Sequence, residues 1–153
     1  MNHPVDPVIE ADLEAYVEGQ LPVARRIEVE AHLCHDPADA LRAVLSIQDE
    51  IADFNRGRSD GGVILKLGLH LGSCIAVTAG GVLDYFGSAV NTASRLEHQC
   101  RGGEVIVSDA VLADSEAREA LKGRMVTEDS ATLRGLIEPV RFVRVGAAKA
   151  IAA

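Results

Sequence analysis

Aromatic residues and cysteines are scarce in this chain of 153 residues. It contains no tryptophan, two tyrosines and three phenylalanines, so aliphatic side chains must supply most of any core. Its three cysteines, Cys34, Cys74 and Cys100, are odd in number and scattered, with no CxxC arrangement. This pattern argues against a disulfide framework and favours reduced thiols, so we expect a cytoplasmic protein.

Long apolar runs and targeting signals are also missing. No stretch approaches eighteen consecutive apolar residues, so no transmembrane helix is expected. The first residues, MNHPVDPVIEADLE, lack the basic segment and apolar core of a signal peptide. Gly80 and Gly81 lack the spaced glycines and the lysine of a Walker motif, which excludes a phosphate loop of that type. The length allows one ordinary domain, or one small domain with an appendage.

Negative charge is concentrated in the first part of the chain. Residues 1–60 carry 13 acidic and 5 basic side chains, whereas residues 61–153 carry 10 of each. Because phosphate contacts need a basic surface, neither a nucleic acid nor an anionic membrane is expected as a partner. A basic protein surface would suit the acidic segment better. The asymmetry also predicts two units of different character.

Residues 7–55 have apolar side chains at roughly helical spacing, which predicts two to three helices. The sequences that carry the pattern are DPVIEADLEAYVEGQ, VARRIEVEAHLCHD and DPADALRAVLSIQDEIADF. Asp36 and Pro37 form a good N-cap and first-turn pair for the last of these. On a helix His32, Cys34 and His35 point in different directions, so we expect no metal site there. Residues 57–62 are the expected linker, and residues 1–56 form the first unit.

Strand patterns dominate residues 63–146, which precede a short tail at 147–153. VILKLGLHLG predicts a strand with His70 packed in a sheet, and SCIAVTAGG and GVLDYFG predict strands around a turn at Gly80–Gly81. SAVNTASRLEHQC predicts a helix with Ser88 as N-cap, EVIVSD a buried strand and AVLADSEAREALKG a second helix. RMVTEDSATLRGL and EPVRFVRV predict two further strands. The expected fold class is α+β, a helical segment followed by a mixed sheet with two helices.

Asn91 and Arg95 stand four residues apart on the first of these helices. Residues at that spacing share a helix face, one turn apart. Spacing alone is typical of a solvated helix face, so the context of the pair decides its meaning.

That context resembles the C-terminal half of a class III adenylate or guanylate cyclase catalytic domain, over residues 63–145. Family members have R-x-G-I-H-x-G, D-x-x-G-x-x-V-N-x-A-x-R-L-E, G-E-I-x-V-S and L-K-G-x-x-E-P-V in this order. Here LGLHLG, DYFGSAVNTASRLE, GGEVIVSD and LRGLIEPV occur at similar separations. Four motifs in order are much more specific than any one of them.

The resemblance implies roles for four residues. Asp84 corresponds to a residue that contacts the purine base, where a carboxylate accepts a hydrogen bond from an exocyclic amine. Asn91 corresponds to the asparagine that orients the ribose, and Arg95 to the arginine that stabilises charge on the attacked phosphate. Arg134 replaces the usual lysine of the L-K-G motif, so it keeps the charge with a different geometry.

The metal-binding half of such a domain is not recognisable in the sequence. Class III cyclases hold two metal ions with a pair of aspartates that precede the matched region, and residues 7–55 show no strand with such a pair. Mg²⁺ or Mn²⁺ with ATP or GTP is therefore expected only if a partner supplies the metal site.

The segment DLEAYVEGQLPVARRIEVEAHLCHDPADALRAV is similar to the helical module of zinc-binding anti-sigma factors. In that family a histidine and two cysteines follow an H-x3-C-x2-C spacing, and counting from His32 places Asp36 and Asp39 at the cysteine positions. Two carboxylates and one imidazole are not a tetrahedral structural zinc site. The resemblance implies a zinc-free module.

Three functions stay open at this point. The first is a truncated cyclase-homology protein in intracellular signalling, a regulatory or interaction module that is not active alone and pairs as a homodimer or with a complete cyclase. The second is a half-site subunit that forms cyclic nucleotide together with a partner cyclase. The third is an anti-sigma-type regulator that holds a sigma factor through residues 7–55. A purine nucleotide is a possible ligand of the first two.

Overall fold

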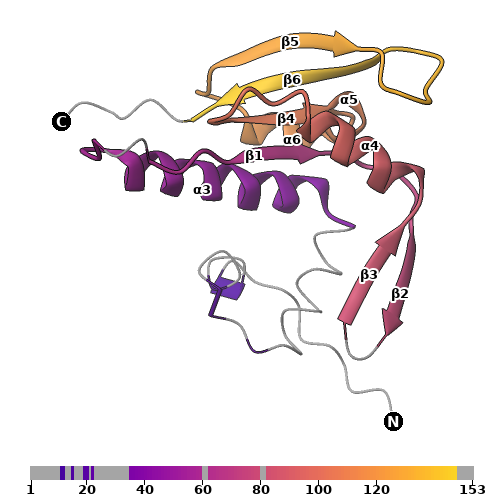
Figure 1. Cartoon of the computed structure of the whole chain (residues 1–153), viewed down its shortest axis with the longest axis horizontal. Helices are drawn as coiled ribbons and strands as arrows, with labels where there is room; N and C mark the ends of the chain where they lie inside the picture. The colour runs from indigo at the N-terminus through magenta and orange to yellow at the C-terminus, as the bar shows by residue number, and fades with distance from the viewer. Residues whose placement is uncertain are drawn as a thin grey trace.

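A computed structural model describes residues 11–12, 15, 19–20, 22, 35–59, 62–79 and 82–147 of the chain. The two helices expected before residue 36 fall largely outside this part, as do His32 and Cys34. Within it, no helix is long and apolar enough to cross a membrane. The described elements form a mixed α+β arrangement of helices and sheet (Figure 1), which confirms the predicted fold class.

The first long element is helix α3, Pro37–Asn55. Asp36 is its N-cap, as predicted: the Asp36 side chain accepts a hydrogen bond from the Asp39 backbone N–H at 2.9 Å. Pro37 occupies the first turn, where a missing N–H costs nothing. The helix lies along one side of the sheet (Figure 1) and buries Leu41 and Leu45.

Six strands follow, in two sheets. The four-stranded sheet has the order β1-β4-β6-β5, with β1 Lys66–Leu69, β4 Glu104–Ser108, β5 Val126–Ala131 and β6 Val140–Gly146. Strands β1 and β4 are parallel, whereas β6 runs antiparallel to both β4 and β5. The other sheet is a hairpin of β2, Ile75–Ala79, and β3, Val82–Phe86, which projects away from the rest (Figure 1). Every strand expected after residue 63 is present.

Three helices lie between these strands. Helix α4 is Ser88–Glu97, and the single helix expected over AVLADSEAREALKG is divided into α5, Asp109–Leu112, and α6, Ser115–Ala120. The prediction of Ser88 as N-cap was wrong. Gly87 occupies the cap with φ 142°, and no side chain caps the helix. A glycine is suited to that backbone conformation because it has no Cβ.

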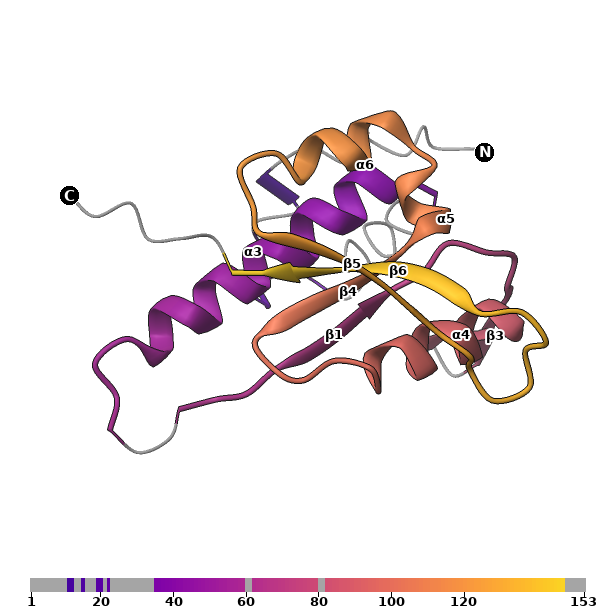
Figure 2. The ribbon, with the colours of Figure 1, turned by 90° about the horizontal axis from the view of Figure 1, so that it is seen from above.

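Apolar side chains fill both faces of the four-stranded sheet. On one face, Val105 and Val107 of β4 join a cluster with Leu41 and Leu45 of α3 and with residues of α5 and α6. On the other face, Ile106 joins a cluster with Leu96 of α4. Because alternate residues of a strand point to opposite faces, α3 and α4 cover opposite sides of the sheet, an arrangement that Figure 2 shows from above.

Glycines in and after β1 allow α4 to lie close to that strand. A Cβ on Gly68 would stand 2.6 Å from the backbone nitrogen of Glu97 and 2.8 Å from the carbonyl oxygen of Ala93, both in α4. A Cβ on Gly72 would stand 2.8 Å from the Cβ of Ala89. The two glycines of LGLHLG thus fix the distance between β1 and the helix that carries Asn91 and Arg95.

Candidate functional site

Helix α4 presents Asn91 and Arg95 on the surface of the molecule. The two side chains are one turn apart, Asn91 exposed and Arg95 half-buried. Thr92 and Leu96 are the buried residues of the helix, so they hold it against the sheet while Asn91 and Arg95 face outward. The structure therefore confirms that Asn91 and Arg95 lie on one helix, one turn apart, as their spacing predicted.

The loop between β5 and β6 approaches Arg95. A Cβ built on Gly135 would lie 3.5 Å from Nη1 of Arg95, and the backbone of Gly135 has φ 81°. Leu133, 3% exposed, joins the same apolar cluster as Leu96 of α4 and fixes the start of this loop. The exposed Arg134 lies between these two residues. The loop motif LRGL and the helix motif NTASR thus meet at one place.

Gly135 is a site residue that the sequence alone did not identify. Its signal in the sequence is the glycine that follows Arg134 in the LRGL motif. A positive φ favours glycine, and a Cβ at this position would already be in van der Waals contact with the Arg95 guanidinium. Gly135 therefore limits where the Arg95 guanidinium can lie.

Asp84 stands apart from these residues, on the projecting hairpin. It lies in β3 opposite Val77, is exposed, and its Oδ1 accepts a hydrogen bond from the Tyr85 backbone N–H at 2.8 Å. Within the described part of the chain, no hydrogen bond or ion pair joins Asp84 to Asn91, Arg95 or Arg134. The structure brings Arg95 and the loop of Arg134 together, but it does not connect Asp84 with them.

Most arginines of the sheet and its helices are paired, whereas Arg95, Arg134 and the loop residue Arg101 have no side-chain hydrogen bond or ion pair with another described residue. Arg144 donates to Glu104 at 2.6 Å and to Asp129 at 2.9 Å, and this hydrogen bond lowers the pKa of Asp129. Other arginines also bind carboxylates; among them Arg124 bonds Asp49 at 3.0 and 2.5 Å and Arg141 pairs with Asp109 at 2.9 Å.

By contrast, the side chains of Asn91, Arg95 and Arg134 form no hydrogen bond or ion pair with another described residue. A guanidinium offers five donors in a planar fork that matches phosphate oxygens. Arg95, which lies beside Gly135, and Arg134, the residue before Gly135, therefore carry positive charge that no described residue pairs, in a protein whose net charge is −8. This arrangement can bind an anion.

Metal ligands do not accompany these side chains in the described residues. No group of three or more histidine, cysteine, aspartate or glutamate side chains there could hold a metal ion. The pair of metal ions that the resemblance implies needs clustered carboxylates, and the described residues do not fit it. No catalytic step through a metal ion follows from this part of the chain.

His70 comes directly after β1 and is half-buried rather than part of the strand. Its Nδ1 lies 2.9 Å from Oγ of Ser108, which is 1% exposed and ends β4. Burial lowers the pKa of His70 from its ordinary value of 6.5 because a low-dielectric surrounding disfavours the imidazolium. His70 thus lies one position beyond the strand in which the sequence placed it, and it packs there with Ser108 as its partner.

This lowered pKa predicts that stability falls in mild acid. The unfolded chain binds a proton at His70 below pH 6.5, whereas the folded chain resists protonation until a lower pH. The stability that neutral His70 contributes is therefore lost as the pH falls from about 6.5 through the folded pKa. Urea unfolding at several pH values should show a smaller decrease for His70→Gln than for the wild type. An equal slope in both proteins would contradict this assignment.

Two adenylate cyclases have stretches similar to this chain. The pH-sensitive adenylate cyclase MT1302 of Mycobacterium tuberculosis (strain CDC 1551 / Oshkosh) is 36% identical over 115 residues, which cover 74% of this chain and 26% of that protein. The receptor-type adenylate cyclase GRESAG 4.3 of Trypanosoma brucei brucei is 31% identical over 90 residues, or 56% of this chain and 7% of that protein. The chain thus corresponds to a small part of each relative.

A solved structure has the same fold. The catalytic core of a rhodopsin-guanylyl cyclase with converted specificity, in complex with ATPαS, superposes with a TM-score of 0.55 at 25% identity. The superposition covers 74% of this chain and 59% of that structure. The likeness of residues 12–44 to anti-sigma factors finds no such support.

The sequence pattern of a catalytic domain family extends over most of the chain. The family described as "Adenylate and Guanylate cyclase catalytic domain" matches residues 24–142. This match runs across the expected linker at residues 57–62 and includes α3, which shares the core of the sheet. The chain belongs to the adenylate and guanylate cyclase catalytic domain family.

Proposed function

We propose that this chain is a regulatory or interaction module of cyclic nucleotide signalling and forms no cyclic nucleotide by itself. The observation that carries the proposal is a mismatch within the described residues. Asn91 and Arg95 correspond to the residues that the family uses on ribose and phosphate, and Arg134 keeps the charge of a family lysine, but among the described residues no cluster of metal ligands accompanies them. Stabilising the charge of a transferring phosphoryl group relies heavily on such metal ions.

A purine nucleoside triphosphate is the ligand that these side chains suit. Arg95 and Arg134 would contact phosphate oxygens, because neither side chain is paired with a described residue. Gly135, which follows Arg134 in the chain, lies close to the Arg95 guanidinium. Asn91, one turn from Arg95, would donate to the ribose and accept from it. Asp84 would contact the base from the hairpin of β2 and β3. It would use Oδ2, because Oδ1 accepts the hydrogen bond from the Tyr85 backbone N–H. Support comes from the ATPαS held by the related rhodopsin-guanylyl cyclase core.

Two measurements on the full chain test this proposal. Incubation with ATP or GTP and Mn²⁺ should yield no cyclic nucleotide. Titration calorimetry with the same nucleotides should show binding that Arg95→Ala weakens by about 10-fold or more, the loss of one charge-assisted contact. Turnover that disappears in Arg95→Ala would overturn the inactive assignment, and the absence of nucleotide binding would overturn the ligand.

A second function, a half-site subunit, is favoured by the position of Arg95. Members of the family work as dimers in which one subunit supplies the metal-binding side and the other the Asn/Arg side. Here the apolar cluster of Leu133 and Leu96 joins the β5–β6 loop to α4, and Gly135 of that loop lies beside Arg95. Neither contact neutralises the charge of Arg95. The partner would be a second copy or a complete cyclase, which would bring Mg²⁺ or Mn²⁺ to the shared site.

A further inference from the structure

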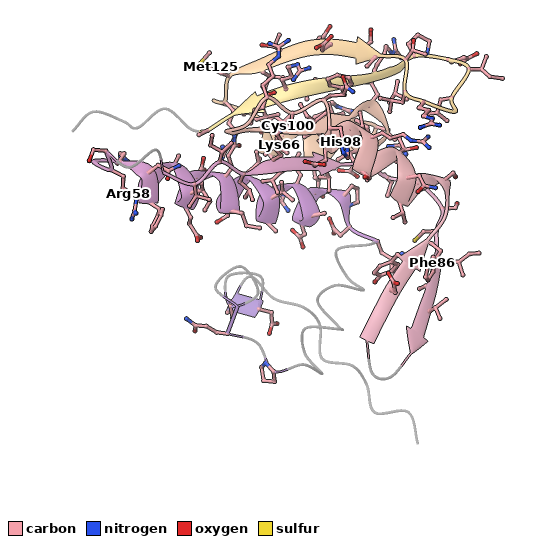
Figure 3. All side chains as sticks on the ribbon, in the orientation of Figure 1. Arg58, Lys66, Phe86, His98, Cys100 and Met125 are labelled. Carbon is pink, nitrogen blue, oxygen red and sulfur yellow. The ribbon has the colours of Figure 1, made fainter. Side chains whose placement is uncertain are left out.

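A groove of about 270 Å³ lies at the end of the four-stranded sheet where β1 and β4 begin. The C-terminal half of α3 forms one wall, and residues 63–65 before β1 and Gly102–Gly103 before β4 form the others. Figure 3 labels Lys66, where β1 begins, and Cys100, whose thiol donates to the Glu104 carbonyl at 3.1 Å. The residues of the candidate site on α4 and the β5–β6 loop do not line this groove.

Two contacts hold the walls of the groove at a fixed separation. Asn55 of α3 donates from Nδ2 to the Val63 carbonyl at 2.7 Å, and its Oδ1 accepts from the Val63 N–H at 2.8 Å. Ile64 packs on Gly102, where a Cβ would stand only 2.5 Å from Cγ2 of Ile64. The groove is therefore formed before any molecule enters it, as ligand sites usually are.

Gln48 is a buried polar side chain in the wall of this groove, and half of its amide is unpaired. The residue is 4% exposed. Its Nε2 donates to the Gly103 carbonyl at 2.8 Å and to the Val145 carbonyl at 3.1 Å. Because carbonyl oxygens only accept, these two bonds determine which end of the amide is the nitrogen. Its Oε1 is buried and has no hydrogen-bond partner among the described residues.

An acceptor buried without a donor is costly, so this oxygen calls for a partner. The backbone N–H of Gly103, beside the Gln48 amide, is already bonded to the Leu65 carbonyl at 3.1 Å. Ile51 and Ala52, the next residues of α3 in the wall, have aliphatic side chains with no donor. A molecule that enters the groove can bring the missing donor.

The lining indicates what kind of molecule fits. Most of it is aliphatic, as at Ile51, Leu65 and Leu67, so an apolar body is favoured and a charged one would lose its hydration. A cavity of about 150 Å³ is sufficient for benzene, so this groove has room for one or two fused rings. We propose that the groove binds an uncharged, mostly apolar molecule of that size, whose N–H or O–H group donates to Oε1 of Gln48. The proposal does not rest on nucleotide binding.

Indole and benzofuran are matched probes for this site, because they have nearly the same shape and exchange an N–H for a ring oxygen. In nitrogen–proton correlation spectra of the full chain, indole should shift the backbone amides of Leu65 and Gly103 and the side-chain amide of Gln48. The shifts should saturate with a dissociation constant on the order of 1 mM or lower. Benzofuran should bind about 10-fold more weakly, because it presents an acceptor to Oε1. Equal affinities, or no saturable shifts at these amides, would overturn the proposal.

Three variants connect binding with the groove. Gln48→Leu removes the acceptor, so indole and benzofuran should bind with equal affinity. Ala52→Leu narrows the groove and should weaken binding of both probes by about 10-fold or more, whereas Ser46→Leu, on the exposed side of α3, should change neither.

The Ala52→Leu and Ser46→Leu pair decides the matter if Gln48→Leu fails to fold, since that variant also loses the bonds to Gly103 and Val145. A preference for indole that persists in Gln48→Leu would show the proposal to be wrong. Equal effects of Ala52→Leu and Ser46→Leu would do the same.

An ordered water is the competing partner of Gln48 Oε1. Nuclear Overhauser contacts between water and the Gln48 side-chain amide should disappear when indole saturates the groove. Contacts that persist unchanged would mean that water satisfies the oxygen and that the proposal is wrong. Absence of nucleotide binding with indole binding intact would instead count only against the proposed function.

Discussion

Replacing Gly68 with alanine is expected to lower the free energy of unfolding by about 3 kcal/mol. The new Cβ would stand 2.6 Å from the nitrogen of Glu97, 2.8 Å from the oxygen of Ala93 and 2.9 Å from the Cα of Glu97. All three atoms belong to the backbone of α4, which cannot move aside as a flexible side chain can. The whole helix must shift away from β1, so apolar contacts of Leu96 are lost as well. Urea unfolding followed by circular dichroism measures the change.

A second glycine provides the control for this substitution. Gly146 also lies in a strand, and a Cβ there would have the Met125 Cβ at 3.9 Å as its nearest neighbour. Gly146→Ala should therefore change the free energy of unfolding by no more than about 0.5 kcal/mol. Similar losses in both variants would show that the close approach of α4 to β1 is not the cause.

The elements that the sequence predicted correctly have local signals. Helix α3 begins at Asp36 and Pro37 because a side-chain acceptor and a pre-set φ both act within one turn. The two apolar runs that pair as β2 and β3 were likewise recognisable from the sequence, whereas the turn expected at Gly80–Gly81 lies outside the described residues. Such signals depend on a few neighbouring residues, so the sequence alone was sufficient for them.

Boundaries and neighbours depend on more distant residues and were predicted less well. The helix expected after β4 is interrupted at Asp114, whose side chain accepts from the Ala117 N–H and caps α6. That capping signal was present in the sequence but competed with a continuous helical pattern. The pairing of β1 with β4 joins residues almost forty positions apart, and no local pattern specifies it.

In the candidate site, too, some features are specified by neighbouring residues and others by contacts between distant parts of the chain. Asn91 and Arg95 share a helix face through local geometry, so the predicted relation holds in the structure. The approach of Gly135 to Arg95 depends on the burial of Leu133 against Leu96, a contact across the fold. Among the described strands β3 pairs only with β2, and no hydrogen bond or ion pair joins Asp84 to Asn91, Arg95 or Arg134 within the described residues. Motif order alone did not reveal that lack of a direct connection.

Arg95→Ala is expected to abolish complementation of a defective cyclase if this chain completes a shared site. The partner would be a complete cyclase whose own corresponding arginine has been replaced, so that only a mixed dimer contains that charge. Wild-type chain should then restore cyclic nucleotide formation, and Arg95→Ala should restore about 100-fold less. Arg95→Lys should fall between them, because it keeps the charge but loses the planar fork.

Arg101→Ala is the matched control, because Arg101 is exposed and its side chain makes no hydrogen bond or ion pair with a described residue. It lies beyond the C-terminal end of α4, away from the contact between Arg95 and Gly135. This variant should restore as much activity as the wild type, with an unchanged melting temperature in all three variants. Restoration by Arg95→Ala at the wild-type level would exclude Arg95 from the shared site. Failure of the wild-type chain to restore any activity would eliminate the half-site function and leave the inactive module, since unpaired charge at Arg95 then serves binding alone.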